Sequence, residues 1–218
     1  MPLSWNEIKS RALTQKIRQP QSNYLLIPSV SSERRTYVPI GFIGAEVIVS
    51  NLVYSLAGAT PFHFGVLSSA MHNARMRYTC GRLKSDYRYS NRIVYNNFPW
   101  PEFPQNLKTN QSTAHVEKAQ LAIKTEAQAV LDVRAKFQTG SQPATLADLY
   151  DPLTMPPELL KAHQKLDAAV DKAYEASGGK KSYKSDAERV AFLFELYQRY
   201  TSLLPVAAAK GQRRGRAT

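Results

Sequence analysis

Charged and uncharged side chains alternate along residues 81–90, which read GRLKSDYRYS. Successive side chains of an extended strand point to opposite faces, so this alternation would separate the two kinds of side chain in space. A single strand over residues 82–89 would have one wholly charged face and one face that is mostly able to pack. The charged face would comprise Arg82, Lys84, Asp86 and Arg88. A row of cations around one carboxylate is a candidate surface for contacting the edges of DNA bases.

The chemistry of this row suits the major groove of DNA. Lysine and arginine donate hydrogen bonds to guanine O6 and N7, and a carboxylate accepts one from cytosine N4. Lys84 and Asp86 could therefore satisfy the guanine and the cytosine of a single base pair. The alternative is a solvated strand on which Asp86 forms an internal salt bridge with Arg82, Lys84 or Arg88. The spacing alone is compatible with both interpretations.

The wider stretch 72–100 surrounds a single acid, Asp86, with cations, amides and aromatic side chains. Its Lys and Arg residues are Arg75, Arg77, Arg82, Lys84, Arg88 and Arg92. Its interleaved tyrosines and asparagines include Tyr78, Tyr87, Tyr89, Tyr95, Asn91, Asn96 and Asn97. Cations pair with phosphates and asparagine can pair with adenine, so this composition indicates a nucleic-acid surface.

The positive charge of the chain is unevenly distributed. The formal net charge is +12, and residues 1–105 contribute +7 of it, from twelve Lys/Arg and five Asp/Glu. Residues 106–218 contribute +5, of which four charges lie after Leu204 in a stretch without acids. A basic first half beside a nearly neutral second half predicts that the first meets a polyanion and the second is structural.

Several kinds of active site are absent from the sequence. It contains no Gly-rich phosphate loop, no dinucleotide-binding fingerprint and no His/Cys cluster with metal-ligand spacing. His63 and His72 are nine residues apart, which places them about 180° apart around one helix. We therefore expect the chain to bind no metal and no cofactor of its own.

The composition also indicates the cellular compartment of the protein. The single cysteine, Cys80, excludes a disulfide framework. No run of 18 apolar residues is present, and the N-terminal residues lack the apolar segment of a secretory signal. We expect a cytoplasmic protein without membrane contacts.

The first half reads as mixed α and β. Short apolar runs rich in β-branched residues predict strands within 24–30, 36–43 and 45–56. Residues 60–81 switch to helical spacing, with Thr60 as N-cap and Pro61 at the first helical position. Residues 86–98 return to strand composition, and three prolines within 99–105 indicate a domain edge.

The second half reads as helical. Apolar stripes predict helices over 112–137, 156–176 and 185–204. The last helix begins with a capping box of Ser185 and Glu188. The prediction is thus an α+β fold, with a mixed α/β domain at 1–105, a helical domain at 106–204 and a flexible basic tail at 205–218.

Four segments, in this order, resemble the C-terminal part of MmeI-like DNA methyltransferases, the type IIG restriction–modification enzymes. Two resemble the target-recognition domain: YLLIPSVSSERRTYVPIGF (24–42) and FGVLSSAMHNARMRYTCGRLKSDYRYSNRIVYNNFPWPE (64–102). Two more resemble the helical C-terminal domain that follows it: LADLYDPLTMPPELLKAHQKLDAAVDKAY (146–174) and AERVAFLFELYQRY (187–200). The similarity extends from about residue 20 to residue 204.

The resemblance implies a recognition module for double-stranded DNA. By position, the base-reading side chains would include Lys84, Asp86 and Arg88. The expected phosphate contacts are Arg75, Arg77, Arg82, Arg92, Arg34 and Arg35. The module would direct adenine N6 methylation, which S-adenosylmethionine supports in a separate methyltransferase domain or subunit.

The catalytic motifs of the family do not occur in this sequence, so we expect the chain alone to be inactive. An excised piece, a separately encoded specificity subunit and a truncated gene product are all compatible with this, as is a recognition domain that lacks its first residues.

Two other functions stay open from the residues themselves. The helical half could be a protein-interaction adaptor whose basic half is only structural, and exposed apolar residues on the 112–137 helix would favour this. Alternatively, the tyrosines could stack on unpaired RNA bases, although no RNA-binding motif is present.

Overall fold

The computed structural model describes residues 20–101 and 110–202, and it describes the side chains of the second range from Val116 onward. The expected basic tail, 205–218, lies outside these residues. Among the described residues, no helix is both long and apolar enough to cross a membrane.

The predicted α+β architecture is confirmed. The first described range contains β1 (Tyr24–Pro28), β2 (Val30–Ser31), β3 (Gly41–Ile43), β4 (Val53–Ala57), α2 (Pro61–Ser68), α3 (Ala70–Thr79), β5 (Gly81–Leu83), β6 (Asp86–Arg88) and the π-helix η1 (Asn91–Tyr95). The second contains α4 (Asn110–Gln138), α5 (Leu146–Leu149), α6 (Pro157–Ala173), the 3₁₀-helix η2 (Tyr174–Ser177) and α7 (Asp186–Thr201).

Two small antiparallel sheets meet at Ser29. Their strand orders are β3-β1-β4 and β2-β6-β5, and β1 and β2 are successive parts of one chain segment. The Ser29 amide donates to the Leu52 carbonyl, and the Ser29 carbonyl accepts from the Tyr89 amide. Ser29 thereby bridges the strand of one sheet to the strand of the other, so the second sheet has a fixed position on the first.

The helix predicted over 60–81 is two helices, α2 and α3, that are separated at Ser69. The expected start is confirmed, because Thr60 is the N-cap and Pro61 is the first residue of α2. Ser69 has extended backbone angles, and its hydroxyl donates to the Val66 carbonyl while it accepts from the His72 amide. One serine thus ends the first helix and caps the second, a local competition with the helical ladder that side-chain periodicity does not reveal.

The strand predicted over 86–98 is wrong beyond Arg88. Residues Asn91–Tyr95 form a π-helix turn whose N-cap, Ser90, accepts from the Ile93 amide. The cap and the turn chemistry of the Ser–Asn pair outweigh the β-branched composition of the residues that follow.

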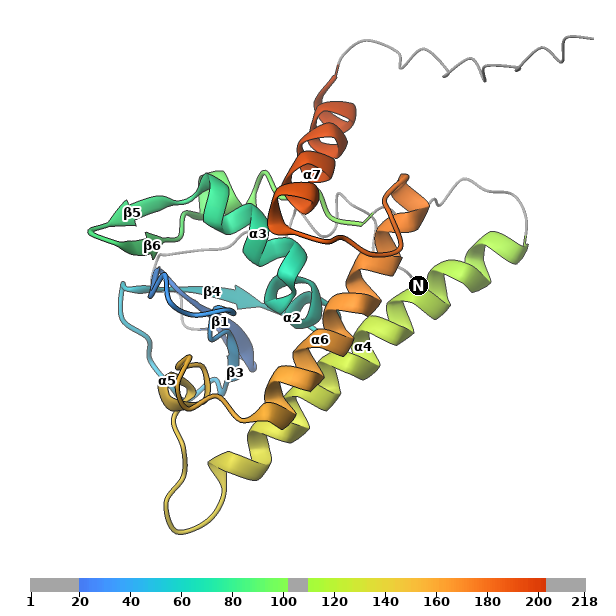
Figure 1. Cartoon of the computed structure of the whole chain (residues 1–218). Helices are drawn as coiled ribbons and strands as arrows, with labels where there is room; N and C mark the ends of the chain where they lie inside the picture. Colours follow the sequence, from blue (N-terminus) through green and yellow to red (C-terminus); the bar gives the residue numbers. More distant parts are fainter. Residues whose placement is uncertain (1–19, 102–109, 203–218) are drawn as a thin grey trace, which may run out of the picture.

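Both described ranges contribute to one buried core. Figure 1 shows α4 and α6 side by side along one edge of the molecule, with the β5–β6 hairpin projecting from the opposite edge. Helix α2 packs against both long helices. A Cβ added to Gly65 of α2 would lie 2.8 Å from Ile123 Cγ2 of α4 and 3.2 Å from Leu166 Cδ1 of α6. The predicted boundary at residue 105 falls between the described ranges and stays a prediction.

Gly65→Val tests this close approach. The added methyl groups would force the helices apart, and we expect the free energy of unfolding to fall by roughly 1–3 kcal/mol. Urea denaturation measures the change. Ala168→Val, on an exposed position of α6, is the control for a β-branched residue in a helix and should cost less than about 1 kcal/mol. Equal losses in both variants would contradict the tight helix crossing.

Candidate nucleic-acid interface

Residues 81–88 form a β-hairpin and not the single strand that the alternating charges suggested. Strand β5 pairs with β6 in the register Gly81↔Arg88, Arg82↔Tyr87 and Leu83↔Asp86. Lys84 and Ser85 form the two-residue turn, and Lys84 has a φ of 55°. A positive φ at the first residue of such a turn is what the favoured hairpin turns require.

The four charged side chains therefore do not share one face, and this part of the prediction is wrong. Directly paired residues lie on the same face of a sheet, so Arg82 is on the face of Tyr87. Asp86 and Arg88 are on the other face, and Lys84 is at the tip of the turn. The base-reading candidates Lys84, Asp86 and Arg88 thus do not lie on the same face as Arg82.

Arg82 holds the hairpin together. Its guanidinium lies over the Tyr87 ring at 4.1 Å, and its Nη1 donates to the Ser85 carbonyl at 2.7 Å. The same nitrogen is 3.3 Å from the Glu33 carboxylate. These contacts close the turn and connect it to the segment after β2.

The internal salt bridge that competed with base reading is not formed in the described part of the chain. Arg82 pairs with Glu33, and Asp86 has no ion pair among the described residues. Lys84 and Arg88 are exposed, and Asp86 is half-buried. Contact between these side chains and a ligand would therefore break no ion pair within the described ranges.

Arg75 is not available to a phosphate. Its side chain is buried between α3 and α7, where the guanidinium lies 4.2 Å from the centre of the Phe194 ring. Burial lowers the pKa of this guanidinium. The sequence could not indicate this, because the aromatic partner belongs to a helix far along the chain. We remove Arg75 from the phosphate candidates.

Arg77 is engaged in a three-way junction. Its Nη1 lies 2.5 Å from the Asp186 carboxylate at the start of α7, and its Nη2 donates to the Thr36 carbonyl. One side chain therefore ties α3 to α7 and to the segment that follows β2. Like Arg82, Arg77 therefore holds separate parts of the fold together.

Residues 32–36 lie beside the hairpin. Strand β2 pairs with β6, and residues 32–36 continue from it next to the turn, where Glu33 meets Arg82. Arg34 and Arg35 directly follow Glu33 in the chain, so they lie near the turn that carries Lys84. Arg34 is exposed and Arg35 is half-buried. Arg92, in η1, is also exposed.

Tyr89 and His72 anchor the base of the hairpin in the core. Tyr89 is buried immediately after β6, and its hydroxyl is 3.1 Å from His72 Nε2 of α3. The Tyr54 hydroxyl donates to the Tyr89 carbonyl. Burial lowers the pKa of His72 to about 3, so its imidazole is neutral at pH 7. The hairpin is thus attached to the helix that precedes it by a buried polar contact.

Asp167 of α6 fixes the beginning of α3. Its two carboxylate oxygens accept from the Ala70 amide and the Tyr37 hydroxyl, each at 2.7 Å. Burial raises the pKa of Asp167 to about 6, and the hydrogen bonds oppose that rise. The first described range, which carries the hairpin, is therefore positioned by a carboxylate from the second.

A second polar chain lies beside this contact. Tyr37 stacks on His163, whose Nε2 is 2.7 Å from the Tyr150 hydroxyl. That hydroxyl accepts from Arg134, which also donates to the Ile40 carbonyl at 2.6 Å. All of these groups are buried. Nothing in the sequence marked Asp167, Arg134 or Glu33, because their partners are distant in the chain.

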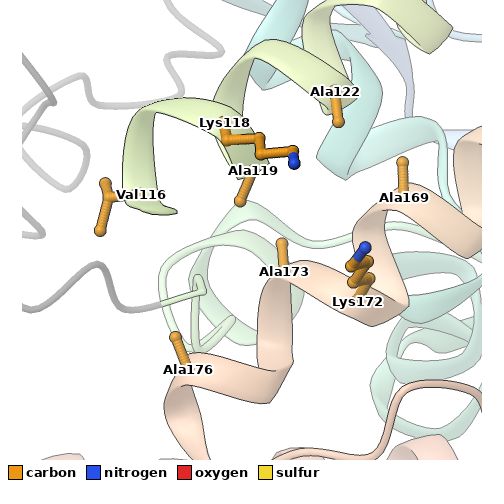
Figure 2. Close-up of a pocket in the computed structure, with 8 residues that line it drawn as sticks. All are labelled: Val116, Lys118, Ala119, Ala122, Ala169, Lys172, Ala173 and Ala176. Atoms are coloured by element: carbon orange, nitrogen blue, oxygen red, sulfur yellow. The ribbon is translucent and has the colours of Figure 1, made fainter. Parts of the chain in front are cut away.

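The described residues contain no group of three or more His, Cys, Asp or Glu side chains that could hold a metal ion. A cavity of about 130 Å³ lies between the start of α4 and the end of α6 (Figure 2). Its lining consists of Val116, Lys118, Ala119, Ala122, Ala169, Lys172, Ala173 and Ala176. Apart from two lysines, the lining side chains offer no polar group to a ligand, and the hairpin is on the opposite edge of the molecule.

Two family profiles match the chain. Residues 6–102 match the description "MmeI, target recognition domain", and residues 115–205 match "MmeI, C-terminal domain". DNA methyltransferase A of Bacillus subtilis (strain 168) is 43% identical over 181 residues, which cover 83% of this chain and 18% of that protein.

A solved structure of the type IIL restriction-modification enzyme MmeI in complex with DNA is also similar, with a TM-score of 0.72 and 48% identity. The match covers 86% of this chain and 22% of that one. The chain therefore spans about a fifth of the length of these relatives.

The buried His72 predicts a pH dependence of stability. Its pKa is about 3 in the folded protein and about 6.5 when unfolded, so unfolding takes up a proton at pH 5. Its stabilising contribution is complete above pH 6.5 and falls as the pH is lowered. Between pH 7 and pH 5 the loss should be about 2 kcal/mol.

His72→Gln keeps a polar group near Tyr89 and removes the titration. Urea denaturation of both proteins at the two pH values should show a smaller loss in the variant by about 2 kcal/mol. Asp167 titrates in the opposite sense but is present in both proteins. An identical loss in both would show that His72 is not held neutral by burial.

Proposed function

Since this chain belongs to the MmeI family, as its target recognition and C-terminal domains, we propose that it binds double-stranded DNA at a specific sequence. The observation that supports this most directly is the hairpin. It presents Lys84 at its tip and Asp86 and Arg88 on one face, without ion pairs to other described side chains. The MmeI enzyme, whose structure is that of a complex with DNA, supports the same proposal because it is 48% identical to this chain in the matched region.

In this proposal, Lys84, Asp86 and Arg88 contact base edges in the major groove. Two donors and an acceptor can distinguish guanine–cytosine from cytosine–guanine, because the two pairs present their groups in reversed order. Arg34, Arg35 and Arg92 would contact phosphates around them. Arg77 and Arg82 would act indirectly, because they hold the hairpin and the 32–36 segment in place.

The chemical step would belong to another part of the enzyme. We propose that this chain has no catalytic activity and directs adenine N6 methylation by a methyltransferase domain or subunit that binds S-adenosylmethionine. Such a role would need the cytoplasmic location expected from the sequence, where the DNA is accessible.

The two alternatives receive little support from the structure. An adaptor would need several apolar side chains exposed on α4. In the described part of that helix, Leu121 is the one large apolar side chain that is exposed. RNA stacking would need several exposed tyrosines, but Tyr89 and Tyr95 are buried and Tyr87 lies under Arg82, which leaves Tyr78 as the exposed one of these four.

Selection from a pool of duplexes with randomised bases tests the proposal on the chain itself. We expect the bound fraction to be enriched in one defined sequence. Enrichment without any base preference, or tighter binding to single-stranded RNA than to duplex DNA, would contradict it.

Exchanging the donor and the acceptor tests the assignment of residues. The double variant Lys84→Glu, Asp86→Arg reverses their order, so the preferred base pair should change at one position and binding should persist. Each good base contact contributes roughly 1–3 kcal/mol of discrimination, or about 5- to 150-fold between the two pairs.

The control is Lys172→Glu with Glu175→Arg, which exchanges two exposed residues, at the end of α6 and in η2, and leaves the net charge unchanged. It should keep the original preference. An unchanged preference in the hairpin variant would remove this role from Lys84 and Asp86.

A further inference from the structure

We propose that the loop between η2 and α7, residues 178–184, extends the DNA-binding surface into the helical half, with Lys181 and Lys184 as phosphate contacts. The inference rests on the proposed function and changes the expectation that the second half is only structural. Both lysines are exposed.

The loop has a defined shape. Gly178 has a φ of 85°, and the Gly179 amide donates to the Tyr174 carbonyl at 2.8 Å. Tyr183 is buried against Phe192, and its hydroxyl accepts from the Lys180 amide. The lysines therefore project from a backbone that is already ordered, and binding would have to restrict only their side chains.

Three acids near the loop already have cationic partners. Asp171 pairs with Arg189 at 2.8 Å, Asp186 with Arg77 at 2.5 Å, and Glu188 with Lys180 at 3.6 Å. Lys181 and Lys184 have no side-chain ion pair within the described ranges. Lys184 and Lys180 share the nearby Glu188 carboxylate, and residues 178–184 contain three lysines and no acid, so the loop offers a net positive charge to a polyanion.

The Arg77 junction brings the end of this loop near residues 32–36. Arg77 contacts Thr36, the residue after Arg35, and Asp186, two residues after Lys184. The packing of α3 on α7, which buries Arg75 against Phe194, keeps the two parts together. A duplex that contacts Arg34 and Arg35 would therefore have its backbone close to the loop.

The salt dependence of duplex binding tests the proposal. The slope of log K against log salt is negative, and each lost phosphate contact makes it shallower by about 0.9. The double variant Lys181→Ala, Lys184→Ala should therefore have a slope that is shallower by about 2. At 0.15 M salt the affinity should fall at least about tenfold. The loss should be equal for all duplexes, and the preferred sequence should not change.

The matched control is Lys118→Ala, Lys124→Ala, which removes two exposed cations from α4. It should leave the slope within about 0.5 of the original. Thermal unfolding of both variants checks that they are folded, and Lys181→Gln, Lys184→Gln gives the same comparison if the alanine variant is unstable.

The outcomes separate the two proposals. Selective binding by the wild type with equal slopes in the loop variant and the control would overturn the role of the loop alone. A change of preference at one base pair would also overturn it, because phosphate contacts carry no sequence information. Binding without any base preference in the wild type would instead contradict the proposed function.

Discussion

The position of the hairpin depends on one half-buried carboxylate, Asp167. It accepts a hydrogen bond from the Ala70 amide at the beginning of α3. Strand β5, the first strand of the hairpin, begins two residues after α3 ends. A carboxylate at a helix N-terminus satisfies an amide that has no partner inside the helix and interacts favourably with the helix dipole. Because Asp167 belongs to α6, the direction of α3, and with it the hairpin, is set by the helical half of the molecule.

Buried polar groups make this junction more specific than an apolar one. The chain Arg134–Tyr150–His163 and the Tyr37–Asp167 pair lie inside one continuous hydrophobic cluster. A buried cation that contacts carbonyl, hydroxyl and ring groups is costly unless the surrounding geometry is kept. Sliding one half past the other would separate these partners, whereas apolar side chains could repack. The two halves can therefore hold a fixed relative orientation, which reading a base sequence requires.

The sequence predicts the helices of the second half well because their apolar stripes extend over several turns. It also locates the basic stretch that contains Lys84, Asp86 and Arg88. It does not reveal the hairpin, because the turn is Lys84–Ser85 and not a glycine-containing pair, and alternation fits a straight strand equally well. The structural roles of Arg75 and Arg77 depend on Phe194 and Asp186, and no local pattern indicates contacts across such a distance in the chain.

The left-handed backbone of Lys84 limits which side chains could take its place. Asparagine, aspartate and glycine adopt that conformation at little cost, whereas β-branched residues such as valine or threonine are strained there. The backbone conformation at position 84 thus restricts which residues are tolerated there, whatever hydrogen bonds they could form with a base. Asp86, in regular β-strand geometry, is free of this restriction, so new specificities should diversify more readily through the strand than through the turn.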